Sequence, residues 1–203
     1  MPESTARTRR TQQERRARAE SALLAAAAEL VAESGTRALT LASVGERAGY
    51  SRGIVNHHFG SIPSLLEVLA RQVQDQLVPE WDELPPGLER LLFILERYLD
   101  TVATGAPITR AFFVMWAESV TRPELAAIFR ERDQAFRASI AADVVLGIEN
   151  GSVRPDLDPH DTAVAIVGDL RGIAIQWLLD RDSADLRRLR KALPELWRRA
   201  LAA

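Results

Sequence analysis

The sequence predicts an all-α protein with a small N-terminal domain, residues 1–60, and a larger C-terminal domain, residues 61–203. Apolar residues recur at intervals of three and four along most of the chain, as on one face of an α-helix. No segment alternates apolar and polar residues with β-branched enrichment, so no strand is expected. Glycine and proline divide the chain into short helices near the N-terminus and longer ones after it.

The N-terminal pattern predicts four helices. Thr40, Ser51 and Ser61 have side chains that cap helix N-termini, and Gly49 suits a helix end. The expected helices are 13–34, 40–48, 51–58 and 61–78. After a linker at 79–87 the pattern stays helical, with expected helices at 88–104, 107–120, 123–150, 160–179 and 184–200. Pro194 should kink or interrupt the last of these, because proline has no backbone N–H.

Composition narrows the class of protein. With 203 residues, 47% of them hydrophobic, the chain can bury a substantial core. It has no cysteine, which excludes disulfides and thiolate metal sites and favours a reducing cytoplasm. No apolar segment follows the arginine-rich N-terminus, and Asp169 and Arg171 interrupt the most apolar run. We therefore expect neither a secretion signal nor a membrane span.

The net charge of −2 is unevenly distributed. Residues 1–60 hold nine arginines and six glutamates, a net +3, whereas residues 61–203 hold 17 basic and 22 acidic residues, a net −5. The arginines of the N-terminal arm are Arg7, Arg9, Arg10, Arg15, Arg16 and Arg18. Such an arm suits an anionic partner, although a solvated tail has the same composition.

The stretch from Thr40 to Ser61, TLASVGERAGYSRGIVNHHFGS, predicts two short helices joined by a tight Gly-Tyr-Ser turn, which is the helix-turn-helix arrangement. On the second helix, Val55 and Phe59 lie four apart and can pack inward. The opposite side is polar and consists of Arg52, Gly53, Asn56 and His57. This side fits the major groove of DNA, where Arg pairs with guanine and Asn with adenine. A plain corner between bundle helices is the alternative.

The same residues resemble the N-terminal signature of the tetracycline-repressor (TetR) family of transcriptional regulators, over roughly residues 22–69. The resemblance implies a three-helix DNA-binding domain, a larger helical domain that binds a small-molecule effector and dimerises, and a homodimer that leaves its operator when the effector binds. It therefore implies a cytoplasmic regulator, most often a repressor in this family. We expect no enzymatic activity, cofactor or metal, and we expect double-stranded DNA as partner.

Individual positions match the family pattern. Thr40 matches a threonine that caps the second helix and often touches phosphate, Ser51 the cap of the recognition helix, and Gly53 a position of close approach. His58 matches a common His-Phe ending, where it contacts phosphate or serves as a last-turn histidine favoured by the helix dipole. The expected DNA-binding residues are Thr40, Ser51, Arg52, Gly53, Asn56, His57, His58, Arg9 and Arg10.

Two positions depart from the family pattern. Asn56 stands where most members have tyrosine, and Ile62 where many have a lysine directed at the DNA backbone. Loss of that lysine lowers the salt dependence of binding by about one unit. The segment GIVNHHFG also resembles the betaine-regulator branch, in which the tyrosine is frequently absent. A helical carrier of lipids or other hydrophobic molecules, without DNA binding, is the rival function, but it has no need of an arginine-rich arm.

The C-terminal domain holds the candidate ligand-binding residues, which are Tyr98, Arg110, Phe112, Phe113, Trp116 and Trp177. Arg110 and Glu118 are the polar candidates to orient a ligand, and a surface position is the equal alternative for each. Each aromatic residue has packing in the core as its alternative, because an aromatic stripe at helical spacing is more often core.

The last two expected helices are the candidate dimer interface. Ile166, Leu170, Ile173 and Trp177 form an apolar stripe, and Leu193 and Trp197 form a second one. The resemblance implies a four-helix interface made by these helices of two subunits. Packing within one chain is the alternative for the first stripe.

Overall fold

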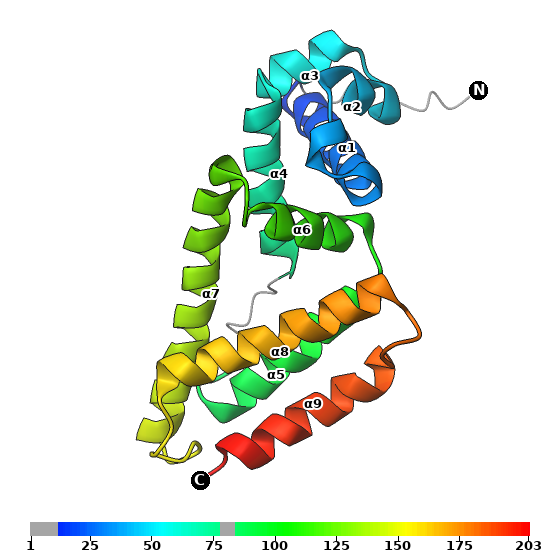
Figure 1. The fold of residues 1–203 in the computed structure, drawn as a ribbon. Coiled ribbons are helices and arrows are strands. Elements are labelled where there is room, and N and C mark those ends of the chain that lie inside the picture. Colours follow the sequence, from blue (N-terminus) through cyan, green and yellow to red (C-terminus); the bar gives the residue numbers. More distant parts are fainter. Residues whose placement is uncertain (1–11, 78–83) are drawn as a thin grey trace, which may run out of the picture. The chain divides into compact units, whose positions relative to one another are not determined.

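The protein is described by a computed structural model, which covers residues 12–77 and 84–203, with side chains left undescribed at 74–77. Within these ranges the chain is helical, as expected, and contains no strand beyond an isolated bridge between Val153 and Ala202. Figure 1 shows the helices α1 (Gln12–Ser34), α2 (Leu41–Ala48), α3 (Arg52–Phe59), α4 (Ile62–Leu77), α5 (Leu88–Ala103), α6 (Pro107–Glu118), α7 (Pro123–Glu149), α8 (Pro159–Leu179) and α9 (Leu186–Leu201). A 3₁₀ turn, Thr36–Ala38, was not expected from the sequence.

The chain folds into two compact units, Met1–Leu69 and Ala70–Ala203. The division falls inside α4, whose first half contributes the buried Leu65, Leu66 and Leu69 to the N-terminal unit. Each unit therefore has its own apolar core, and each is described by itself below.

The core of the N-terminal unit lies where α1 packs on α2 and α2 packs on α3. Val44 of α2 and Val55 of α3 are fully buried, and Phe59 is nearly so. The side of α1 that faces this core is made of small and branched side chains, among them Leu23, Ala27 and Val31. Each helix thus buries one apolar stripe and leaves its other side in solvent.

The C-terminal unit is built around α5, which contacts α7, α8 and α9. Figure 1 shows α8 crossing α5 and α9 running beside it, and α7 packs on both α6 and α8. The bulkiest fully buried side chains in this unit include Tyr98 of α5, Phe113 of α6 and Phe129 of α7. Most of the aromatic candidates of the sequence analysis therefore lie in the interior.

Ion pairs fasten the elements of this unit to one another. Asp143 of α7 is fully buried and accepts hydrogen bonds from the Arg90 side chain, at 2.8 and 3.0 Å, and from the Gly87 backbone N–H at 3.2 Å. Arg190 and Arg198 of α9 pair with Glu96 and Glu89 of α5. The buried pair at Asp143 fixes the start of α5 against α7, while the α9 pairs are exposed and contribute little.

Helix α9 continues through Pro194 as a single element, so the expected interruption is not found. Proline removes only one intrahelical hydrogen bond, and Leu186, Leu193 and Leu201 hold the helix by burial on both sides of it. Packing therefore outweighs the local cost of the proline.

Helix α8 is, among the described helices, the one long and apolar enough to cross a membrane by length and composition. Ile166, Leu170 and Trp177 are instead buried within the unit, and Arg171 is buried among them. Such a pattern is that of a core helix.

The same burial corrects part of the expected dimer interface, whereas Ile173 and Trp197 of the two predicted stripes are half-buried. The stripe of Ile166, Leu170 and Trp177 packs inside its own subunit, with Leu170 fully buried, so it is not available to a second copy. The sequence could not show this, because α5 and α7 cover the stripe from distant parts of the chain. The outward side of α8 is the opposite one, where Gly168 and Gly172 have open space in place of a side chain.

Candidate functional site

The start of α2 is fixed by a reciprocal pair of hydrogen bonds. The Ser43 backbone N–H donates to the Thr40 hydroxyl at 3.0 Å, and the Thr40 backbone N–H donates to the Ser43 hydroxyl at 3.1 Å. This is a capping box in which serine replaces the usual Glu or Gln. The cap predicted at Thr40 is present, and Ser51 caps α3 by accepting from the Ile54 backbone N–H at 3.3 Å.

Two glycines explain the tight turn between α2 and α3. Gly49 ends α2 with a φ of 75°, in the left-handed region that other residues rarely adopt. At Gly45, a Cβ atom would lie 2.7 Å from the carbonyl oxygen of Tyr50, so the turn can approach α2 only because position 45 has no side chain. The close helix-turn-helix packing thus requires glycine at positions 45 and 49.

The polar side of α3 faces solvent. Arg52, Gly53, Asn56 and His57 are all exposed, while Val55 and Phe59 on the opposite side are buried. At Gly53 a Cβ atom would meet only the Ser51 hydroxyl, at 3.6 Å, so the fold itself does not require glycine there. The exposed side chains are positioned to meet a partner, and their role in DNA binding stays a prediction.

His58 differs from its neighbour His57. It is half-buried, and its ring centroid lies 6.0 Å from the ring of Phe59. This position suits a residue that closes the last turn of α3, and it leaves part of the imidazole in solvent. Arg9 and Arg10 of the arm lie outside the described residues.

An ion-pair cluster braces α2 against α1. Arg47 donates to Glu33 at 2.9 and 2.8 Å and to Glu29 at 3.2 Å. The hydrogen bond from Arg47 lowers the pKa of Glu33, and Glu33 in turn raises the pKa of Arg47. The cluster is exposed, so water screens it and it contributes modestly to the orientation of the two helices.

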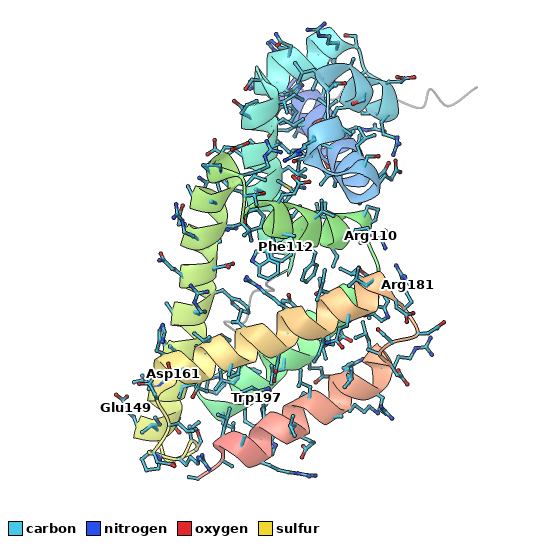
Figure 2. All side chains as sticks on the ribbon, in the orientation of Figure 1. Arg110, Phe112, Glu149, Asp161, Arg181 and Trp197 are labelled. Atoms are coloured by element: carbon cyan, nitrogen blue, oxygen red, sulfur yellow. The ribbon has the colours of Figure 1, made fainter. Side chains whose placement is uncertain are left out.

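In the C-terminal unit, α6 presents three of the aromatic candidates together. The Phe112 ring stands edge-on to Phe113 at 5.0 Å, and Phe113 stands edge-on to Trp116 at 6.5 Å. Figure 2 shows Phe112 pointing from α6 toward α8. Phe112 and Phe113 are buried and Trp116 is half-buried, so this row of rings forms one wall of the unit's interior.

The charged groups beside these rings are residues that the sequence analysis did not select. Arg171 of α8 donates two hydrogen bonds to Asp133 of α7, at 2.7 and 2.5 Å, and Trp116 Nε1 donates to Asp133 at 3.3 Å. The guanidinium carbon of Arg171 lies 4.9 Å from the centroid of the Trp116 ring and 5.8 Å from that of Phe112. The one sequence signal was the interruption of an apolar run by Arg171.

Tyr98 of α5 lies next to this ion pair. Burial raises the pKa of its hydroxyl, the charge of Arg171 opposes that shift, and the charge of Asp133 adds to it. The Tyr98 hydroxyl and the Nε of Arg171 are both buried without a hydrogen-bond partner in the described chain. Both atoms are enclosed by the surrounding side chains, so they belong to the interior of the unit.

Arg110 and Trp177 make other contacts. Arg110 is exposed and donates to the carbonyl oxygen of Leu178 at 3.2 Å, where it ties α6 to the end of α8. Trp177 is covered by Arg181, whose guanidinium carbon lies 4.2 Å from the ring centroid. Neither is linked to the Arg171–Asp133 pair by any of these contacts.

A cleft of about 340 Å³ opens beside Trp116 and Arg171. Its walls come from α6, α7 and the outward side of α8. The lining residues are Trp116, Arg137, Val164, Val167, Gly168, Arg171, Gly172 and Ile175. The cleft is apolar apart from its two arginines, and its size falls in the range of small-molecule sites.

Two family profiles match the sequence. The family described as "BetI-type transcriptional repressor, C-terminal" matches residues 87–202, and "Bacterial regulatory proteins, tetR family" matches residues 23–69. The first match alone covers more than half of the chain, and the two together cover both compact units.

Characterised relatives are similar over part of their length. The HTH-type transcriptional regulator BetI of Paraburkholderia xenovorans (strain LB400) is 26% identical over 127 residues, which are 60% of this chain and 65% of the relative. BetI of Burkholderia mallei (strain NCTC 10229) is 28% identical over 126 residues, with the same coverage. The alignments thus span just under two thirds of these relatives.

Solved structures share the fold over nearly the whole chain. NalD, the secondary repressor of the MexAB-OprM multidrug efflux pump in Pseudomonas aeruginosa, superposes with a TM-score of 0.73 at 22% identity, covering 93% of this chain and 98% of NalD. A transcriptional regulator from Saccharomonospora viridis, in complex with choline, gives 0.76 at 20% identity, covering 92% and 99%. AibR, in complex with isovaleryl coenzyme A and operator DNA, gives 0.72 at 16% identity, covering 88% and 97%.

Proposed function

The chain belongs to the TetR family of transcriptional regulators, and we propose that it is a ligand-responsive, DNA-binding repressor. It binds a palindromic operator as a homodimer in the cytoplasm, and a small-molecule effector bound in the C-terminal unit releases it. The observation that carries the proposal is the exposed polar side of α3, held by a capped and glycine-dependent helix-turn-helix. The protein needs no catalytic group for this function.

Arg52, Asn56 and His57 contact base edges in the major groove. The side chains of Arg52 and Asn56 make no hydrogen bond with the described part of the chain, so their donors and acceptors are available to DNA. Arg52→Ala should cost about 1 to 3 kcal/mol of binding free energy and relax the preference at one base pair. Thr40 and Ser51, at the starts of α2 and α3, are placed for phosphate contacts, and Arg9 and Arg10 add charge.

Dimerisation supplies the spacing of the two recognition helices. One short helix contacts only a few base pairs, so specificity requires two of them about 34 to 36 Å apart or a multiple of a helical turn. The interface uses the outer α8–α9 surface, which we define as Gly168, Gly172 and Leu179 of α8 with Leu196 of α9. Leu179 and Leu196 are 81% and 61% exposed in the single chain, and the two glycines allow a second helix to approach closely.

The dimer surface is tested by Leu196→Glu. Two such charges would face each other across the two-fold axis, so sedimentation should show a monomer with unchanged helical content. Val120→Glu is the matched control, because Val120 is 85% exposed just after α6 and is not one of the residues of this surface. A Leu196→Glu protein that sediments like the wild type at the same concentration would remove this surface from the interface.

The function as a whole is tested by selecting fragments of the source genome with the purified protein. A regulator enriches a small set of fragments that share an inverted repeat, and the Arg52→Ala variant enriches them less strongly and tolerates other bases at one position of the repeat. Recovery of fragments in proportion to their input would contradict DNA-specific binding, and would favour a carrier of hydrophobic molecules that shares the fold.

A further inference from the structure

The C-terminal unit contains aromatic rings and a carboxylate that are suited to binding a cation. The side chain of Arg171, from the same chain, occupies the position between them. The ring faces of Trp116 and Phe112 and the carboxylate of Asp133 surround the Arg171 guanidinium, at the distances given above. Aromatic faces with a nearby acid are the means by which proteins bind quaternary ammonium ligands. Here Arg171 takes the place that such a ligand would need.

Displacing Arg171 would be unfavourable. Its side chain is about nine-tenths buried, and two of its N–H groups are committed to Asp133. A ligand cation that took over Asp133 would leave the guanidinium buried without a counter-charge, which costs far more than a surface rearrangement. The site therefore disfavours quaternary ammonium compounds.

The groups that remain available beside Arg171 are donors and positive charge. Arg137, half-buried in α7, also lines the cleft and forms no ion pair within the described ranges. Asp133 lies behind Arg171, so the side chains of Arg171, Arg137 and Asp133 together carry a net charge of one positive unit. The cleft can therefore accept one negative charge.

We propose that the cleft binds an apolar molecule that carries a single carboxylate, with Arg171 and Arg137 as the specificity-determining residues. The apolar part contacts Trp116, Val167 and Ile175, and the carboxylate accepts hydrogen bonds from Arg137 and lies near the positive charge of Arg171. Within the proposed function, this molecule is the chemical class of the effector. The cleft adjoins the outer α8–α9 surface through Gly168 and Gly172, so its occupant lies close to the second subunit.

Three probes with the same six-carbon chain test the proposal: hexanoate, 1-hexanol and hexyltrimethylammonium. Isothermal titration of the full-length protein, without DNA, should show that hexanoate binds, that hexanol binds at least about tenfold more weakly, and that hexyltrimethylammonium does not bind. Arg137→Met should weaken hexanoate by about tenfold or more and leave hexanol unchanged. Arg130→Met is the matched control, because Arg130 is exposed on α7 two turns before Arg137, and it should change nothing.

Arg171→Met provides the converse test. Without the guanidinium, the rings and Asp133 become available, and the variant should bind hexyltrimethylammonium while losing hexanoate. If this variant does not fold, the comparison of Arg137→Met with Arg130→Met decides the question. Absence of hexanoate binding, equal binding of all three probes, or wild-type preference for the ammonium probe would overturn the proposal. Because no DNA is present, failure of the proposed DNA binding would show only in the fragment selection.

Discussion

The candidate DNA-binding surface lies on consecutive turns of the single helix α3, whereas the candidate effector site joins residues from α6, α7 and α8 beside the buried Arg171. In the first, Arg52 and Asn56 are set by a cap and a turn a few residues away. In the second, Asp133 and Arg171 meet although they are 38 positions apart. Local chemistry therefore determines one site, and tertiary packing determines the other.

Substitutions at the two sites should therefore differ in whether they reduce the stability of the fold or the affinity for a partner. The side chains on the polar side of α3 are exposed, and the ring contact of His57 with His58 lies within the same helix, so changes there should alter binding and leave the fold intact. Changes at Arg171 and Asp133 or on the inner side of α8 should reduce the stability of the fold more than they alter binding, because every group there is held by several neighbours. The predictions below test that division, beginning with the largest effect.

Leu170→Ala should destabilise the protein by about 2 to 5 kcal/mol, because Leu170 is fully buried on the inner side of α8. Denaturant unfolding followed by circular dichroism measures the loss. Gln176→Ala on the same helix is the control, since Gln176 is exposed and its truncation should change stability by no more than about 0.5 kcal/mol. Equal losses for the two variants would mean that the inner and outer sides of α8 are wrongly assigned.

Two glycines in the helix-turn-helix should behave oppositely. Gly45→Ala places a Cβ atom against the Tyr50 carbonyl and should destabilise the N-terminal unit by about 1 to 3 kcal/mol. Gly53→Ala meets no such obstacle and replaces glycine inside a helix, so it should leave stability equal or raise it by up to about 1 kcal/mol. Under the proposed function, operator affinity should nevertheless fall for Gly53→Ala, because the added methyl group would obstruct a close approach of DNA. If Gly53→Ala lost stability and kept its operator affinity, glycine at position 53 would serve the fold and not DNA binding.

The smallest effect is expected at Glu33 and depends on pH. Its pKa is lowered from 4.5 by the hydrogen bond from Arg47, so the folded state favours the carboxylate. That stabilisation is present above pH 4.5 and is lost as the pH falls through the lower, folded-state pKa. The wild type should therefore be slightly more stable than Glu33→Gln at neutral pH, and the difference should vanish in acid. A difference that is the same at both pH values would show that the ion pair with Arg47 is not its source.

The sequence was sufficient for the helices and for the exposed side of α3, because both depend on near neighbours. Thr40, Ser51 and Gly49 lie at the helix ends where their side-chain chemistry predicts them. Val55 and Phe59, four residues apart, share the buried side of α3. A helix boundary and a helical face can be derived from spacing alone.

The sequence was insufficient wherever a distant element decides the outcome. Leu170 looked suitable for a dimer interface, and only the positions of α5 and α7 show that it is covered within one chain. Asp133 carries no pattern that distinguishes it from other acidic residues of α7, and its pairing with Arg171 arises from the crossing of two helices. Arg110 was selected for its charge beside an aromatic run, but its helical position turns it to solvent.

The most direct test of the regulator concerns the polar side of α3. Fluorescence anisotropy would compare the wild type with the Arg52→Ala, Asn56→Ala, His57→Ala triple variant, at one salt concentration, on an operator obtained by fragment selection and on unrelated DNA of equal length. We predict a loss of at least about a hundredfold on the operator, from three base contacts of about 1 to 3 kcal/mol each, with a much smaller change on the unrelated DNA and unchanged circular dichroism. Equal operator affinity for the variant and the wild type would contradict the assignment of α3 as the recognition helix.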